Sequence, residues 1–125
     1  MLTIDSVVLY VKNIEVSQQF YTQVLGCDSQ VLSPTFVAIN FANNITVTLK
    51  QNTDLTPVSS ITGGGSELSI VVADSTKLQQ LYQSWKGHLV EFAQDPIQLL
   101  FGINFVALDP DGHRIRVFSQ KVAEL

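Results

Sequence analysis

Residues 107–118 read ALDPDGHRIRVF, and this stretch decides the fold. An apolar run leads into a Pro-Asp-Gly turn, in which Pro110 presets φ at the first turn position and Gly112 accepts a positive φ. After the turn, aliphatic residues alternate with residues of another kind, as expected of a strand whose successive side chains point to two opposite faces. The stretch therefore predicts a tight turn that leads into a strand with two distinct faces.

The two faces of this strand differ in character. Ile115 and Val117 give one face the apolar side chains of a protein core. The opposite face carries two guanidinium groups and an aromatic ring, from Arg114, Arg116 and Phe118. Burying guanidinium groups is costly unless they have partners. We therefore expect the function of the protein to lie on this second face.

Composition predicts a folded chain with a sizeable core and few surface charges. Apolar residues make up 46% of the 125 residues and charged residues 14%, which is well below the usual charged fraction of about 25%. A chain with so few charges often covers part of its surface by association. We therefore expect an oligomer.

The net charge and the single cysteine exclude several classes of protein. The net charge of −4 argues against nucleic acid as a partner, because binding phosphates requires a basic face. Cys27 cannot form an internal disulfide, which fits a reducing cytoplasm. The sequence shows no signal peptide pattern, in which a basic stretch is followed by an apolar one. It also has no apolar run that approaches the roughly 18 residues of a membrane-spanning helix. We expect a cytoplasmic protein with neither a nucleic acid nor a membrane as partner.

The first half of the chain predicts a strand, a helix and three further strands. Residues 4–11 alternate as a strand, and Asn13 is a good N-cap for the helix that follows. Gly26 ends this helix as a residue that tolerates a positive φ. The apolar positions of the helix are Val16, Phe20, Tyr21 and Val24. The later strands are expected at residues 27–32, 35–41 and 45–51, with a turn at Asn43 and Asn44 between the last two.

The second half repeats this pattern after a Gly-containing linker at residues 53–65. A shift of 61 positions superimposes the opening elements, since it carries Ser6 to Glu67, Asn13 to Asp74 and Gly26 to Gly87. After the second helix, strands are expected at residues 88–94, 103–108 and 113–119, with a longer loop at residues 95–101. The chain is thus predicted to be a single domain, residues 1–125, built of two βαβββ units at residues 1–52 and 66–125.

This repeat resembles the vicinal oxygen chelate superfamily, which includes glyoxalase I, extradiol dioxygenases and the bleomycin-resistance proteins. The resemblance rests on VVLYV at residues 7–11, QQFYTQVLG at 18–26 and VALDPDGHRIRVF at 106–118, and it spans essentially the whole chain. It implies an α+β fold in which two tandem βαβββ units form curved mixed sheets around a cup, with the helices outside. Two units of such proteins pair, often between two chains, so a homodimer is expected.

The resemblance also implies where a metal would bind. Enzymes of the family hold a divalent metal with four ligands, usually His and Glu, and the matching positions here are Ser6, Thr48, Glu67 and Arg116. Hydroxyl groups are weak ligands, and a guanidinium is a fixed cation without an acceptor. Since only Glu67 is competent, we expect no metal, no other cofactor and no metal-assisted chemistry.

We predict that a small-molecule pocket replaces the metal site. Glu67 and Arg116 are expected to lie close enough for a bidentate pair on its floor, although a purely structural pair explains them equally well. Lys50 or Arg114 would orient an acidic group of the ligand. Strand alternation predicts that the pocket is lined by Ser6, Val8, Tyr10, Thr46, Thr48, Lys50, Glu67, Ser69, Val71, Arg114, Arg116 and Phe118. We assign no catalytic residue.

The remaining aromatic and histidine residues are assigned to structure. We expect Trp85, near a helix end, to pack against the sheet, and His113, after the turn glycine, to face solvent. The other residues expected in the core are Phe20, Phe36, Phe41, Leu81 and Tyr82.

Our leading hypothesis is a metal-independent protein that binds a small, partly aromatic molecule, with antibiotic sequestration as its use. Metal-free members of the family, the bleomycin- and phenazine-resistance proteins, are dimers that hold an antibiotic between aromatic side chains. The stretches SPTFVAINF, SELSIVV and LFGINFVALDPDGHRIRV resemble the phenazine type, although residues 45–51 lack a Trp that could stack on a drug. The alternatives are a lyase or isomerase that uses Glu67 as a base or binds a metal through an unusual set of ligands, and a regulatory module with an empty cup.

Overall fold

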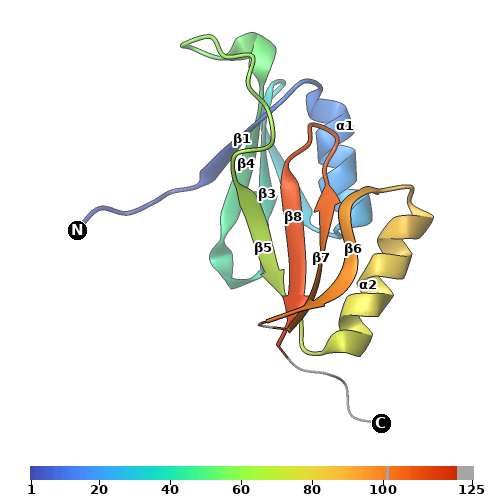
Figure 1. Ribbon diagram of the computed structural model, residues 1–125. Helices are drawn as coiled ribbons and strands as arrows, with labels where there is room; N and C mark the ends of the chain where they lie inside the picture. The colour runs from blue at the N-terminus through green and yellow to red at the C-terminus, as the bar shows by residue number, and fades with distance from the viewer. Residues whose placement is uncertain (101, 121–125) are drawn as a thin grey trace. The chain divides into compact units, whose positions relative to one another are not determined.

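A computed structural model describes residues 1–100 and 102–120 of the chain (Figure 1). The chain divides into two compact units, one formed by Met1–Gly63 and one that begins at Gly64. Each unit is a four-stranded mixed sheet with a helix, in the element order βαβββ. This confirms the predicted α+β fold. Residues 101 and 121–125, which fall within the predicted second unit, lie outside the described residues.

The first unit has the strand order β1-β4-β3-β2, with β1 parallel to β4 and the other pairs antiparallel. Its first strand begins at Val7 and is shorter than predicted, since Ile4 is exposed and unpaired with the sheet. The elements are β1 (Val7–Val11), α1 (Ile14–Gln19), the π-helical turn η1 (Phe20–Val24), β2 (Asp28–Ser33), β3 (Phe36–Asn40), the 3₁₀ turn η2 (Ala42–Asn44), β4 (Thr46–Gln51) and η3 (Asn52–Asp54).

The second unit has the equivalent order β5-β8-β7-β6, again with its first and last strands parallel. The register is the same in both sheets, because Val8 lies opposite Thr48 in the first and Ser69 opposite Arg116 in the second. The elements are β5 (Glu67–Val71), α2 (Ser75–Gly87), β6 (Glu91–Leu99), β7 (Gly102–Leu108) and β8 (Arg114–Ser119).

Both helices begin at the caps that the sequence predicts. The side chain of Asn13 accepts hydrogen bonds from the backbone N–H groups of Glu15 and Val16, at 3.0 and 3.1 Å. Asp74 accepts one from the backbone N–H of Lys77 at 2.9 Å. These bonds satisfy N–H groups that have no partner within the helix, and this fixes where each helix starts.

The buried face of the first helix differs from the prediction. Val16 is 48% exposed, whereas Ile14, Ser17 and Tyr21 are buried. These three residues follow the helical i, i+3, i+7 spacing. The small Ser17 side chain lies at the centre of that face, where a hydrophobicity pattern does not reveal it.

The core of the second unit is an aromatic cluster between α2 and the sheet. The ring of Phe105 on β7 meets Tyr82 and Trp85 of α2 edge-on, with centroid separations of 5.5 and 5.4 Å. Ile115 and Val117 of β8 are completely buried, as the alternation of the strand predicts. Trp85 therefore has the packing role expected of it.

Two predictions about β6 are wrong. Residues 95–99, predicted as part of a loop, continue the strand to Leu99, with Ile97 opposite Asn104; residue 101 of that predicted loop is not described. The strand accommodates Pro96 because it lies at the sheet edge and its register shifts between Gln94 and Ile97. The strand also begins at Glu91 rather than at residue 88, since His88 caps α2.

His113 is buried rather than exposed to solvent as expected. The carboxylate Oδ1 of Asp109 accepts hydrogen bonds from the backbone N–H groups of Asp111 and His113, both at 2.9 Å. The N–H of Asp109 in turn donates to the carbonyl of His113 at 3.0 Å. The turn thus closes on itself, and Gly112 adopts the positive φ (83°) that this closure requires. The expected core residues Phe20, Phe36, Phe41 and Leu81 are only half-buried.

Gly102, at the start of β7, is predicted to be essential for stability. It adopts a φ of 129°, and a Cβ there would collide with the backbone carbonyl oxygen of Ser119. We expect Gly102→Ala to lower the free energy of unfolding by about 1–3 kcal/mol in urea denaturation. Gly87→Ala, at a helical position where a Cβ meets nothing within 4 Å, is the control and should not destabilise the protein. Equal stability of the two variants would contradict the inference that a Cβ at Gly102 collides with the backbone of Ser119.

Candidate functional site

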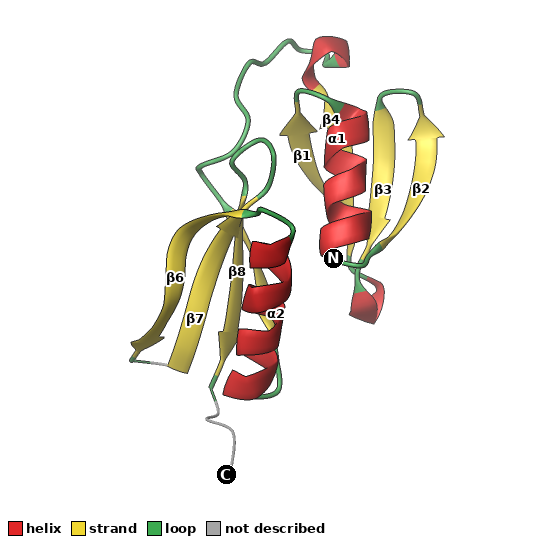
Figure 2. Cartoon of the chain, turned by 90° about the vertical axis from the view of Figure 1, so that its right-hand side faces the viewer, coloured by secondary structure: helices red, strands yellow, loops and turns green. Residues whose placement is uncertain are grey.

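Each sheet has one face covered by its own helix and one face that its helix does not cover, as Figure 2 shows. The second face is called here the open face of the unit. In the second unit, strand alternation and the observed register place a mixture of polar, charged and apolar side chains on it. On β5, β7 and β8 they are Glu67, Ser69, Val71, Asn104, Val106, Leu108, Arg114, Arg116 and Phe118, and on β6 Glu91 and Gln94 lie opposite Leu108 and Val106.

Arg116 is held in place by partners on neighbouring strands of the open face. Its Nε donates to Oε2 of Glu67 at 2.8 Å, and its Nη1 donates to Oδ1 of Asn104 at 2.6 Å. The same Asn104 oxygen accepts from Nε2 of Gln94 at 3.1 Å. The predicted Glu67–Arg116 pair is present, but it is not bidentate, because a single hydrogen bond, from Nε to Oε2, joins the two groups.

A cavity of about 220 Å³ lies beside this guanidinium on the open face. It combines a cation, a carboxamide, an aromatic ring and an aliphatic side chain, which is the usual mixture in a small-molecule site. The residues that line it are Leu99, Gly102, Asn104, Arg116 and Phe118. Of the residues predicted for the pocket, Arg116 and Phe118 line this cavity.

Sequence reasoning missed Asn104, Leu99, Gly102 and Gln94. A signal for Asn104 was available, because it is a polar residue within the apolar strand GINFVAL and lies on the face opposite Phe105. Leu99 was missed because the end of β6 was predicted as a loop.

The predicted pocket residues of the first unit lie on its own open face. Val8 is opposite Thr48, and Tyr10 is opposite Lys50. The hydroxyl of Thr48 is buried and has no hydrogen-bond partner among the described residues, an arrangement that costs about 1–3 kcal/mol. Ser6 precedes β1, and Thr46 is half-buried at the start of β4.

Lys50 contacts three neighbours within the first unit. Its Nζ lies 3.1 Å from Oδ2 of Asp54 and 3.2 Å from Oγ1 of Thr35. It also lies 5.4 Å from the centroid of the Phe36 ring. Arg114, in contrast, is exposed and makes no ion pair with another described residue.

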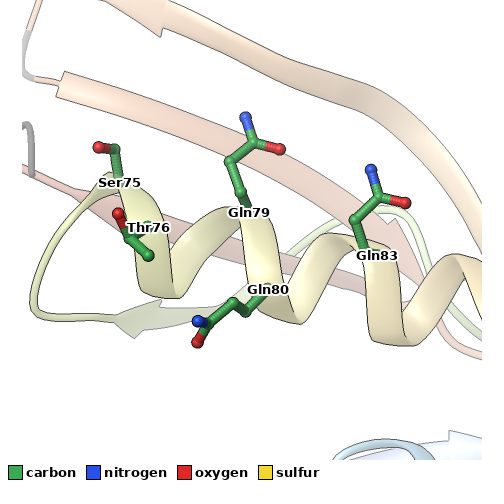
Figure 3. Close-up of a pocket in the computed structure, with 5 residues that line it drawn as sticks. All are labelled: Ser75, Thr76, Gln79, Gln80 and Gln83. Atoms are coloured by element: carbon green, nitrogen blue, oxygen red, sulfur yellow. The ribbon is translucent and has the colours of Figure 1, made fainter.

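The outer surface of α2 carries the shallow pocket drawn in Figure 3. Its labelled lining residues are hydroxyl and amide side chains of this single helix: Ser75, Thr76, Gln79, Gln80 and Gln83. Because this pocket is more open and its lining has neither a charged group nor an aromatic ring, the Arg116 cavity is the better candidate site.

Comparison with known proteins identifies the family. Residues 3–117 match the model of the glyoxalase/bleomycin resistance protein/dioxygenase superfamily. The chain belongs to this superfamily. No helix within the described residues has the length and hydropathy needed to cross a membrane.

Relatives of this chain include a resistance protein and several solved structures. It is 29% identical over 112 residues to the phenazine antibiotic resistance protein EhpR of Enterobacter agglomerans, covering 87% of this chain and 85% of the relative. It is 37% identical to protein ATC0852 of Agrobacterium tumefaciens, with a TM-score of 0.84 and coverage of 99% and 100%. A glyoxalase-related enzyme from Fulvimarina pelagi, 17% identical with a TM-score of 0.83 and coverage of 95% and 88%, shares the fold.

The four positions that the superfamily resemblance assigns to a divalent metal do not fit one in this chain. Glu67 is the only carboxylate among them, and its Oε2 accepts the hydrogen bond from Arg116. The other two residues, Ser6 and Thr48, offer only hydroxyl groups. Residues 1–100 and 102–120 hold no cluster of three or more His, Cys, Asp or Glu side chains that could bind a metal.

Thr35, Lys50 and Asp54 form a network of hydrogen bonds, and the titration of the Asp54 carboxyl group tests whether this network forms in solution. The hydrogen bond from Thr35, and then the hydrogen bond and charge of Lys50, lower the pKa of Asp54 below its ordinary value of 3.8. Because the folded-state pKa is the lower one, any stability from this network is complete above the ordinary pKa and is lost as the pH falls through the lowered value. We expect ¹³C NMR titration to show this low midpoint.

Removing the largest contributor should raise the Asp54 pKa towards its ordinary value, so Thr35→Val is the variant of choice. Thr53→Val is the control, since Thr53 bonds Gln51 rather than Asp54. An unchanged pKa in Thr35→Val would show that the network does not form in solution.

Proposed function

We propose that the protein is a cytoplasmic, metal-independent homodimer that binds a small, partly aromatic molecule without converting it, and that it serves to sequester an antibiotic. The observation that carries the proposal is the cavity beside Arg116, where a fixed cation and the Phe118 ring share one apolar recess. The relationship to a phenazine antibiotic resistance protein supports this choice of ligand class.

The chemistry of the cavity favours binding over catalysis. A guanidinium stays protonated at neutral pH, and a carboxamide does not titrate, so neither Arg116 nor Asn104 can act as a general base. Glu67, the candidate base of the enzyme alternative, accepts the Arg116 Nε–H through Oε2. Burial, with the nearby charge of Asp28, raises the pKa of the Cys27 thiol, which disfavours a thiolate nucleophile.

The open faces support the wider predicted pocket and the homodimer. Ser6, Val8, Tyr10, Thr46, Thr48 and Lys50 remain our proposed contributors from the first unit, and Glu67, Ser69, Val71 and Arg114 from the second. Val8 and Val71 are 46% and 67% exposed. Exposed valines on a weakly charged chain fit a surface that a second copy or a ligand covers.

Binding can be tested with phenazine and bleomycin in equilibrium dialysis, using ligand absorbance as the readout. Trp85 is a poor reporter, because it is buried against Phe105 in the aromatic cluster. We expect saturable binding of at least one compound and, by mass spectrometry, recovery of the ligand unchanged. Phe118→Leu should weaken binding by about 2- to 10-fold through loss of aromatic stacking.

The matched control for that variant is Phe20→Leu, a half-buried ring on the helical side of the first unit. Absence of saturable binding by either compound, or conversion of a bound compound to product, would contradict the proposed function. Sedimentation equilibrium of the same protein should give the mass of two chains.

A further inference from the structure

We propose that Arg116 recognises a carboxylate of the ligand, so that the bound molecule is a planar aromatic acid. The inference rests on the proposed function, because it specifies what the cavity of the second unit binds. From the sequence, Lys50 or Arg114 was expected to orient an acidic group, and the role of the Glu67–Arg116 pair was left open between structure and ligand binding.

The hydrogen bonds of Arg116 leave donors available to a ligand. A guanidinium has five N–H groups, of which one on Nε goes to Glu67 and one on Nη1 to Asn104. Nη2 donates to no other described residue, and Arg116 lines the cavity. Planar pairs of N–H groups match the two oxygens of a carboxylate, which makes arginine the usual residue for recognising this group.

The charges on the parallel strands β5 and β8 also favour an anion near Arg116, and Glu91, on the same face, lies two strands away from β8, opposite Leu108. Glu67 offsets one positive charge, but Arg114 and Arg116 alternate along β8 and provide two. Arg114 lies opposite Glu67 in the strand register, yet the carboxylate pairs with Arg116. The Glu67–Arg114–Arg116 cluster therefore carries an excess of one positive charge on a chain whose net charge is −4, and this excess attracts an anionic ligand.

Asn104 is assigned as a positioning residue for Arg116. Its side chain is buried, with 6% of the residue exposed, and it receives hydrogen bonds from both Arg116 and Gln94. A guanidinium that is already fixed loses little conformational freedom when a ligand binds. Asn104 therefore acts through Arg116, on the carboxylate end of the ligand.

The shape of the cavity indicates the remainder of the ligand. Its volume of about 220 Å³ is smaller than the roughly 300–1,000 Å³ of sites that enclose a whole drug-sized molecule. It therefore holds one end of the ligand. Leu99 and Phe118 provide apolar walls for a ring, and Arg116 lies where a carboxylate on that ring can reach it.

The test compares two probes that differ in the carboxylate, phenazine and phenazine-1-carboxylate, by isothermal titration calorimetry. We expect the wild-type protein to bind the carboxylate about 10- to 100-fold more tightly, as hydrogen bonds to a charged group allow. Arg116→Met should abolish this preference, so that the variant binds the two probes with equal affinity. Lys77→Met removes the same charge from the exposed surface of α2 and is the matched control, which should keep the preference.

Asn104→Leu tests the positioning role, because it leaves the charge of Arg116 in place. We expect it to reduce the preference for phenazine-1-carboxylate over phenazine, with circular dichroism and thermal unfolding used to confirm that each variant is folded. The wild-type comparison of the two probes does not depend on any variant.

The outcomes separate this inference from the proposed function. Equal affinity of the wild-type protein for the two probes would overturn the carboxylate assignment while leaving a phenazine-binding protein. A preference that survives in folded Arg116→Met would also overturn it. Failure of both probes to bind would contradict the ligand class of the proposed function, and the carboxylate assignment with it.

Discussion

The hydrogen bond between Nε of Arg116 and Oε2 of Glu67 joins the first and last strands of the second unit on their open face. A guanidinium on a sheet face needs partners, and here Glu67 supplies the charge and Asn104 a second acceptor. Gln94 extends the connection to the edge strand β6. The open face is consequently polar at its centre and apolar towards Phe118, and the cavity lies at that boundary.

Under the proposed function, this arrangement would let a member of the glyoxalase/bleomycin resistance protein/dioxygenase superfamily bind a small molecule without a metal. The position that resemblance assigns to a metal ligand carries a permanent cation, and the one competent carboxylate is its partner. A metal ion would have to displace that cation from Glu67, with only hydroxyl groups as further ligands. An anionic ligand, in contrast, benefits from the guanidinium, because the remaining N–H groups are donors of the geometry that a carboxylate accepts.

The sequence predicted features that depend on local chemistry or on alternation. The caps Asn13 and Asp74, the turn at Gly112, the buried Ile115 and Val117 and the Glu67–Arg116 contact belong to this group. Features that depend on which strands pair, and in which register, were not predicted. The extension of β6 through Pro96 results from an edge position and a register shift, and Asn104 gains its role only when β7 lies between β6 and β8. The contacts of Lys50 were not predicted, because Thr35 lies in the turn before β3 and Asp54 in η3, and no periodicity indicates that their side chains meet.

We infer that the Glu67–Arg116 pair has taken the place of a metal. Elemental analysis of protein that has been incubated with Zn²⁺, Ni²⁺, Mn²⁺ or Fe²⁺ and then desalted tests this inference. We expect far less than one metal ion per chain for each of these metals, with no difference between the wild-type protein and Glu67→Gln. One tightly held metal ion per chain that disappears in Glu67→Gln would contradict it.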